Sequence, residues 1–307
     1  MTAVRQPGSA ARAWVLVVTA VLGIALAAPI GSATAAPALA VAFWRAAFGT
    51  LATAPVVALT RRRELAALDR ATARSCLLSG VFLAAHFALW LPSLRLTSVT
   101  VSTALVVTGP VWTVAWQRLR GERVPGGVVV GVGLALGGVL VMTGVDAGTS
   151  PTALLGDLLA LGGGIAGAAY TLVGESVRRT TSTGVYTLLA YGTCAILMAA
   201  VCLLAGLSLG GYASRTWGEL VVLAVAAQLV GHTLLNAAVP VVGATPLSLA
   251  ILFEIPGASL VAWVWLGQVP PLGVVPGAAL VLVGLALVVR AQGRARNEAF
   301  VDARGVV

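Results

Sequence analysis

Three polar side chains interrupt the long apolar stretch of residues 231–256, namely His232, Asn236 and Glu254. A carboxylate within an apolar helix can bind a proton or a substrate amine, although inserting it into a bilayer costs about 2.5–3.5 kcal/mol. Such a group is a candidate functional site by default. The alternative for Glu254 is a structural carboxylate that hydrogen-bonds to a neighbouring helix.

Small residues surround Glu254 on the helix that the sequence predicts for it. Ala250, Gly257 and Ala258 are spaced to share its helical face. A face of small residues packs against other helices rather than lipid, so we expect Glu254 to point into a helix bundle. Pro256 has no backbone N–H, and we expect it to open the helix locally and leave carbonyl groups for a ligand.

A polar stripe on the preceding predicted helix consists of Gln228, His232 and Asn236, which recur at every fourth residue. It is either the wall of a wet cavity or a set of interhelical hydrogen bonds, each worth only ~0.6 kcal/mol. For His232 we favour the structural role, because His86 is its counterpart in an earlier copy of the same stretch, residues 85–110. In that earlier copy, Trp90 stands at the position that Asn236 occupies in the later one. An apolar wall opposite a polar one suits an amphipathic substrate, although aromatic packing explains His86 and Trp90 equally well.

Two further candidates lie in other apolar runs. Arg45 lies about seven residues inside the run of residues 38–59, roughly 10 Å from its end at 1.5 Å per residue. It can bind a substrate carboxylate, extend to the membrane surface or pair with a buried acid. Tyr170 either lines a cavity or packs between helices. Four glycines near it permit close helix packing: Gly163, Gly164, Gly167 and Gly174.

The elements that must position these residues come in two copies. Residues 85–110 align with residues 231–256 at an offset of 146 positions without a gap. An ungapped register that continues over about fifty residues indicates an internal duplication. Pro110 is thereby the structural counterpart of Pro256. The other matched pairs include His86 and His232, Ser102 and Ser248, Gly131 and Gly277, and Gly138 and Gly284.

The composition requires a membrane protein. Hydrophobic residues make up 59% of the chain and charged residues only 9%, whereas soluble domains carry roughly 25% charged residues. The long, continuous apolar runs fit membrane helices of ~20 residues, not the alternating segments of a β-barrel. Cys76, Cys194 and Cys202 all lie inside these runs without metal-ligand spacing, so we expect them to be small apolar fillers.

We predict an all-α membrane protein with ten transmembrane helices, arranged as two inverted five-helix repeats. The first repeat would cover residues 1–145 and the second 146–290, followed by a frayed polar tail at 291–307. A polar linker at residues 146–152 would separate the halves. The expected helices are 13–35, 38–59, 75–94, 98–118, 126–145, 154–175, 184–207, 219–239, 244–266 and 272–290.

The N-terminal run admits a second interpretation. Arg5 and Arg12, the apolar run and the residues Ala33-Thr34-Ala35 resemble a secretory signal with its cleavage site. The run is longer than the 7–15 residues typical of a signal, and cleavage would remove one helix of the duplicated unit. We therefore favour a membrane helix.

Arginine distribution predicts the orientation. With the N-terminus in the cytoplasm, 16 of the 19 arginines fall in cytoplasmic loops or tails and two outside, while Arg45 lies in a helix. Because five is odd, the second repeat would enter the membrane upside down. The loop Arg118–Arg123 carries three arginines and its counterpart, Leu266–Pro271, carries none. We expect both termini on the cytoplasmic side of a bacterial inner membrane.

The motifs HFALW…LRLTSVTVSTALVVTGPVW…RGERVPGG and their echo GHTLLN…ATPLSLAILFEIPGASLVAWVWLG resemble the EamA-type transporters of the drug/metabolite transporter superfamily. Pro37 and Arg45 fit the same pattern. The resemblance covers nearly the whole chain and implies ten helices and export or exchange of small metabolites. The family usually ends both hairpins with Gly-Glu. Glu122 keeps this feature, but Gln268 replaces the second glutamate.

We therefore expect a proton-coupled secondary transporter that works by alternating access around a midplane cavity. The alternatives are an uncoupled facilitator or exchanger and a membrane scaffold without transport. The expected partners are a small amphipathic or amino-acid-like substrate, the lipid bilayer, protons and a second copy of the chain; nucleic acid is not expected. We expect no enzyme activity, metal or cofactor, because the sequence lacks the metalloprotease and P-loop motifs.

Overall fold

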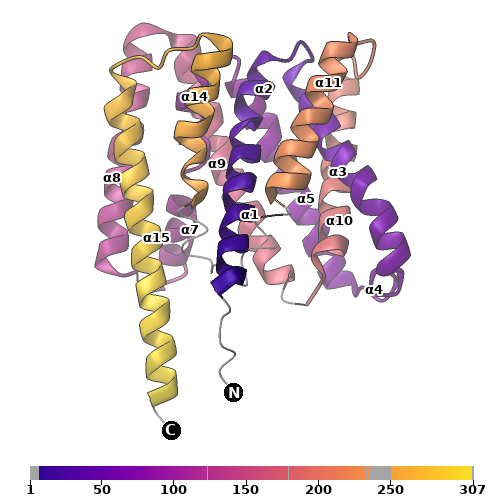
Figure 1. Ribbon diagram of the computed structural model, residues 1–307, viewed down its shortest axis with the longest axis horizontal. Helices are drawn as coiled ribbons and strands as arrows, with labels where there is room; N and C mark the ends of the chain where they lie inside the picture. Colours follow the sequence, from indigo (N-terminus) through magenta and orange to yellow (C-terminus); the bar gives the residue numbers. More distant parts are fainter. Residues whose placement is uncertain (1–6, 123, 179, 233, 235–249, 306–307) are drawn as a thin grey trace.

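The computed structural model describes residues 7–305 apart from 123, 179, 233 and 235–249. All regular elements within these residues are helical (Figure 1). The helices are α1 (Pro7–Ala25), α2 (Ala27–Ala33), α3 (Ala38–Thr60), α4 (Arg62–Ala66), α5 (Arg70–Ser93), α6 (Val99–Val106), α7 (Gly109–Leu119), α8 (Gly126–Thr149), α9 (Pro151–Val177), α10 (Thr183–Leu204), α11 (Ser214–Leu223), the π-helix η1 (Ala224–His232), α14 (Glu254–Leu266) and α15 (Val274–Gly305).

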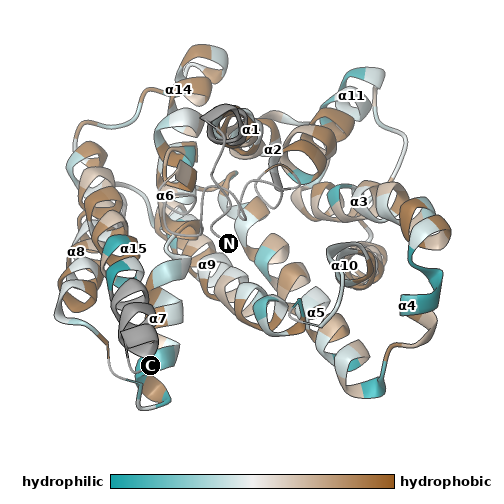
Figure 2. Ribbon diagram, turned by 60° about the horizontal axis from the view of Figure 1, so that its bottom comes forward, coloured by the Kyte–Doolittle hydropathy of each residue, from teal (hydrophilic) through white to brown (hydrophobic). Residues whose placement is uncertain are grey.

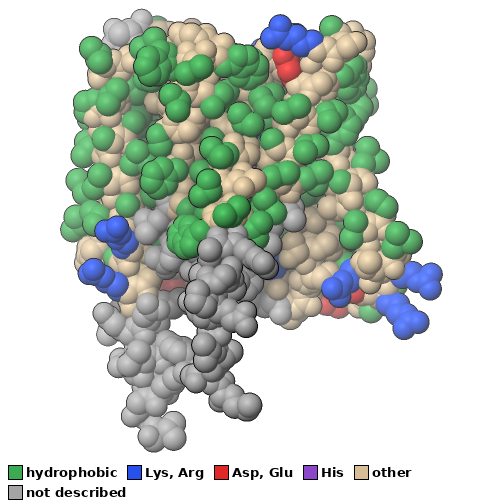
Figure 3. Space-filling model, viewed as in Figure 1, with side chains coloured by type: hydrophobic (Ala, Val, Ile, Leu, Met, Phe, Trp, Pro, Cys, Tyr) green, Lys and Arg blue, Asp and Glu red, His purple; other side chains and the backbone are tan. Residues whose placement is uncertain are grey.

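Seven helical segments of the described chain are long and apolar enough to cross a membrane. Two shorter apolar helices lie at Gly126–Met142 and Glu254–Leu266. Large hydrophobic side chains cover the flank of the molecule between its two ends, and most arginines gather at one end (Figure 3). The short helix α4 at that end is the most hydrophilic segment (Figure 2). This distribution is that of a multi-pass membrane protein.

One expected helix in each repeat is broken near its middle. The run at 98–118 separates into α6 and α7 at Val107–Thr108, directly before Pro110. In the second repeat the chain turns at Leu252–Phe253, α14 begins at Glu254, and Pro256 lies in its first turn. A proline lacks the N–H that would continue the hydrogen-bonded ladder, which explains both interruptions. The local opening of the helix that we expected near Pro256 is therefore present near Pro110 as well.

Two predicted boundaries are wrong. The tail after residue 290 is not frayed, because α15 continues through it to Gly305; its Arg, Ala, Gln and Glu residues favour helix. The linker at 146–152 is reduced to Ser150, whose hydroxyl accepts a hydrogen bond from the Ala153 N–H at 3.2 Å. The run at 13–35 is confirmed as one apolar span, Trp14–Ala33, with a turn at Leu26. Part of the expected helices at 219–239 and 244–266 lies outside the described residues.

Glycines of α8 and α15 allow the two repeats to meet backbone to backbone. These helices are repeat-mates that run in opposite directions beside each other (Figure 1). A Cβ added at Gly138 would lie 2.5 Å from the carbonyl oxygen of Gly277, and one at Gly284 would lie 2.5 Å from that of Gly131. No side chain fits there, so the duplicated glycines set the spacing between the repeats.

We expect Gly138→Ala and Gly284→Ala to destabilise the protein by about 1–3 kcal/mol, because each added methyl group meets rigid backbone. Gly133→Ala on the same helix is the matched control, since a Cβ there meets nothing within 4 Å. Size-exclusion chromatography of detergent extracts after graded heating measures the difference. Equal melting temperatures for Gly138→Ala and Gly133→Ala would contradict the interpretation.

Candidate functional site

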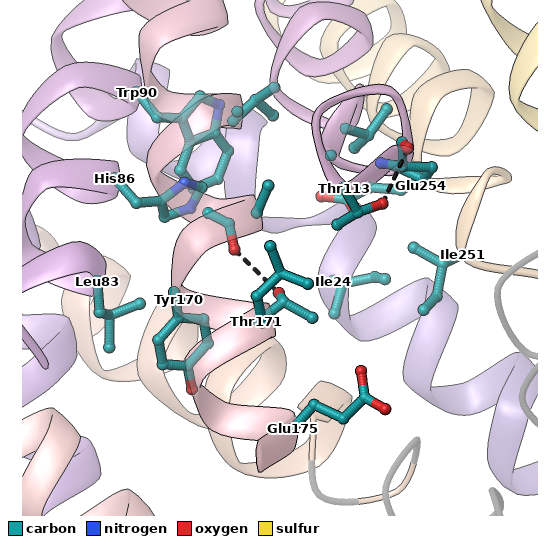
Figure 4. Close-up of a pocket in the computed structure, with 18 of the residues that line it drawn as sticks. Ile24, Leu83, His86, Trp90, Thr113, Tyr170, Thr171, Glu175, Ile251 and Glu254 are labelled. Atoms are coloured by element: carbon teal, nitrogen blue, oxygen red, sulfur yellow. Dashed lines mark hydrogen bonds between the residues drawn. The ribbon is translucent and has the colours of Figure 1, made fainter. Parts of the chain in front are cut away.

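A cavity of about 860 Å³ lies between the two repeats and receives side chains from both. Its lining comes from α5, α6, α7, η1 and α14, together with α1, α3, α9, α10 and α15. Its volume falls in the range of small-molecule sites, about 300–1,000 Å³. Figure 4 shows His86 and Trp90 on one side of this space and Glu254 and Ile251 on the other.

The cavity brings together six of the residues singled out from the sequence: Arg45, His86, Trp90, Tyr170, Gln228 and Glu254. Pro110 lines it as well, at the break between α6 and α7. Asn236 and the side chain of His232 lie outside the described residues. These six residues come from five separate apolar runs and share one space, as a binding site requires.

Arg45 is the charged group at the centre of this arrangement. It is only 4% exposed, so it does not extend to the membrane surface. Its Nε donates a hydrogen bond to Gln228 Oε1 at 2.9 Å, which joins α3 of the first repeat to η1 of the second. The guanidinium carbon lies 4.6 Å from the ring centre of Phe87, a cation–π contact. These contacts fix the direction of the side chain.

Glu254 supplies the opposite charge. It lies in the first turn of α14, where the positive end of the helix dipole favours a negative group. The charges of Glu254 and Arg45 attract each other, but neither a hydrogen bond nor a salt bridge joins these two described residues. The small face around Glu254 packs as expected, because Ala258 is fully buried and Gly257 approaches Ala25.

His86 is held in one tautomer by the neighbouring helix. Its Nδ1 lies 2.8 Å from the carbonyl oxygen of Gly163. A carbonyl only accepts, so Nδ1 carries the proton and Nε2 is left as the acceptor. The ring stacks on Trp90 with centroids 5.6 Å apart. A Cβ at Gly167 would lie 3.0 Å from His86 Nδ1, so the glycines of α9 allow this close approach.

The aromatic wall also contains residues that the sequence analysis missed. Tyr191, which is 7% exposed, lines the cavity and corresponds to Arg45 under the 146-residue offset. Tyr170 stacks on Tyr186, with ring centroids 6.1 Å apart. The hydroxyls of Tyr186 and Ser79 are 2.6 Å apart. Mapping Arg45 across the duplication would have identified Tyr191.

The cavity opens toward the arginine-rich end of the molecule. Its lining reaches Glu122, Thr183 and Gln292, which lie near that end, and includes no residue of the loops at the other end. There, Arg95 donates hydrogen bonds to the carbonyls of Thr34 and Ala36. Gln268 Oε1, at the position where a glutamate was expected, accepts from the Val99 N–H at 3.3 Å.

The fold and site thus define a multi-pass helical membrane protein with a duplicated architecture and a polar cavity between the repeats. The family model of the EamA-like transporters matches residues 11–144 and 154–290. The chain belongs to the EamA-like transporter family, part of the drug/metabolite transporter superfamily. The two matches end 146 residues apart, which equals the offset of the repeat.

Other comparisons add information about the fold alone. No curated protein matches the chain. A solved structure whose title is "Crystal structure of protein" superposes with a TM-score of 0.62 over 90% of this chain and 96% of that chain. The two sequences are 20% identical. This likeness supports the helical architecture and carries no information about substrate.

We expect Thr171→Cys to react with a hydrophilic maleimide added from the side of the membrane that holds Arg63, because Thr171 lines the open part of the cavity. Arg63→Cys marks that side. The wild-type protein is the control, since its three cysteines are buried. Vesicles of both orientations and mass spectrometry give the labelled fraction. Reaction only from the opposite side would contradict the direction of opening.

Proposed function

We propose that this protein is a secondary transporter that exports or exchanges small amphipathic, amino-acid-like metabolites across a bacterial inner membrane. The observation that carries the proposal is the cavity between the repeats, in which a guanidinium and a carboxylate face one space without bonding to each other. Opposite charges held apart suit a substrate that has a charged group at each end. The aromatic side chains that line the same cavity suit an apolar substrate body.

The proposed transport cycle is alternating access. The present cavity opens at the arginine-rich end, which the arginine distribution assigns to the cytoplasm together with both termini. Ten spans in two inverted repeats would let one repeat rock against the other. The breaks at Val107–Thr108 and Leu252–Phe253 differ by one residue under the repeat offset, so each repeat would have a half-helix end beside the substrate. The cycle would have to break contacts between the repeats at the far end, among them the hydrogen bond from the Val99 N–H to Gln268 Oε1.

Glu254 is the proposed proton carrier. An ionised Glu254 attracts a substrate amine, whereas a protonated one does not. Binding of a proton and of an amine at the same carboxylate is therefore mutually exclusive. Exclusive occupancy makes inward movement of a proton drive outward movement of the substrate. The same carboxylate without proton transfer would give an uncoupled exchanger.

We expect Glu254→Gln to abolish the acceleration of amino-acid flux by a pH gradient in proteoliposomes, because the amide cannot exchange a proton. Glu219→Gln is the matched control, since Glu219 forms an exposed ion pair with Arg215 at 3.0 Å, away from the cavity. Counterflow of a mixture of labelled amino acids supplies the signal.

The outcomes separate the candidate functions. Gradient-driven flux in wild type and Glu219→Gln, but not in Glu254→Gln, supports proton coupling. Wild-type flux that ignores the gradient indicates an uncoupled facilitator or exchanger. If Glu254→Gln transports at the wild-type rate and stays gradient-responsive, Glu254 is not the proton carrier. Absence of flux for every compound tested would favour a scaffold.

A further inference from the structure

We propose that the Nη1 of Arg45 and the Nε1 of Trp90 together form a binding subsite for a carboxylate group of the substrate. The inference rests on the proposed transport function and makes it more specific, because it requires an anionic group in every good substrate. It also assigns Trp90 a polar role, in addition to its packing against His86.

Both nitrogens are buried donors without a hydrogen-bond partner in the part of the chain that the structure describes. The two residues are 4% and 3% exposed, and both line the cavity. A buried donor left unpaired is unfavourable, and more so when it carries charge. Two such donors beside one cavity indicate a ligand that accepts hydrogen bonds.

The geometry suits a single small acceptor group. The guanidinium carbon of Arg45 lies 5.8 Å from the ring centre of Trp90. The two side chains are therefore neighbours in the cavity wall. A carboxylate has two acceptor oxygens, each of which can receive a hydrogen bond of about 2.9 Å, so one carboxylate can accept from two neighbouring donors. A neutral amide offers one acceptor oxygen and two unwanted donors. An ammonium group would be repelled by Arg45.

Neighbouring contacts hold both donors in place before a ligand arrives. The Nε of Arg45 is occupied by Gln228, and Phe87 covers one face of the guanidinium, which leaves Nη1 as the buried donor without a partner. The indole of Trp90 is stacked on His86, and a Cβ at Gly163 would touch its Cβ at 3.1 Å. Prearranged donors lose little entropy on binding, so the subsite discriminates by geometry as well as charge. Gln228 is accordingly a positioning residue.

The test measures binding by thermal melting of the purified full-length protein. The probes are matched pairs: acetate and acetamide, hexanoate and hexanamide, phenylacetate and phenylacetamide. The variants are Trp90→Phe, which keeps an aromatic ring but loses the N–H donor together with the five-membered half of the indole, and Arg45→Lys, which keeps the charge and loses the planar guanidinium. Trp44→Phe is the matched control, because its indole donates to the Leu209 carbonyl at 2.8 Å and lies outside the cavity lining. Because Trp44→Phe loses the same atoms, it controls for the loss of ring volume.

We expect at least one carboxylate to stabilise wild type and Trp44→Phe more than its amide does. Trp90→Phe should weaken that carboxylate about tenfold while leaving amide binding unchanged. A purely structural Trp90 would lower melting without changing the preference for carboxylate over amide. The assignment is overturned if no carboxylate binds better than its amide, or if Trp90→Phe keeps the wild-type preference. Neither result depends on flux, so carboxylate binding without transport would refute the transporter proposal alone.

Discussion

The cost of burying the Arg45 guanidinium organises the centre of the molecule. A cation removed from water inside a membrane bundle must recover its lost hydration from fixed neighbours. Gln228 supplies an acceptor, Phe87 supplies the face of a ring, and Glu254 supplies an attraction across the cavity. These neighbours come from both repeats, so the charge is compensated only when the repeats are assembled. Compensation is incomplete, because Nη1 has no partner among the described residues. The Arg45 guanidinium therefore both links the two repeats and keeps one donor available for a ligand.

Duplication supplies the scaffold, and differences between the copies supply the chemistry. Both copies carry a proline that breaks a helix, and both carry the glycines that join α8 to α15. Beside the break the two copies carry different side chains. Thr108 is buried and donates a hydrogen bond to the Leu105 carbonyl, whereas its counterpart Glu254 is ionisable. Arg45 likewise corresponds to Tyr191. A symmetric pair of charges of one sign would repel across the cavity, so divergence at these positions is what permits a site for opposite charges.

Much of this architecture could be predicted from the sequence. Membrane thickness sets the length of a spanning helix, and an internal repeat pairs each residue of one copy with a residue of the other. Six candidate residues line one cavity, because polar and charged side chains are unfavourable in contact with lipid. The pairing of Arg45 with Gln228 could not be predicted, as 183 residues separate them and only helix packing brings them together. Tyr191 was missed because a tyrosine in an apolar run resembles an ordinary packing residue. The helical tail was missed because a polar sequence can remain helical outside the bilayer.

The two repeats meet through contacts of different kinds along the flank of the molecule and at its far end. Backbone-to-backbone contact between α8 and α15 is rigid and cannot be exchanged without separating the helices. At the far end, α2, α5, α6 and α14 share an apolar core, to which Arg95 adds hydrogen bonds to two carbonyls within the first repeat. The hydrogen bond from the Val99 N–H to Gln268 joins the first repeat to the second. A neutral hydrogen bond of this kind is worth about 0.5–1.5 kcal/mol net. Replacement of the expected glutamate by the neutral Gln268 keeps this contact free of a charge that would otherwise have to be desolvated at every closure. In the proposed alternating access, α8 with α15 would therefore be the rigid support, and the contact between Gln268 and Val99 is one that the movement would break.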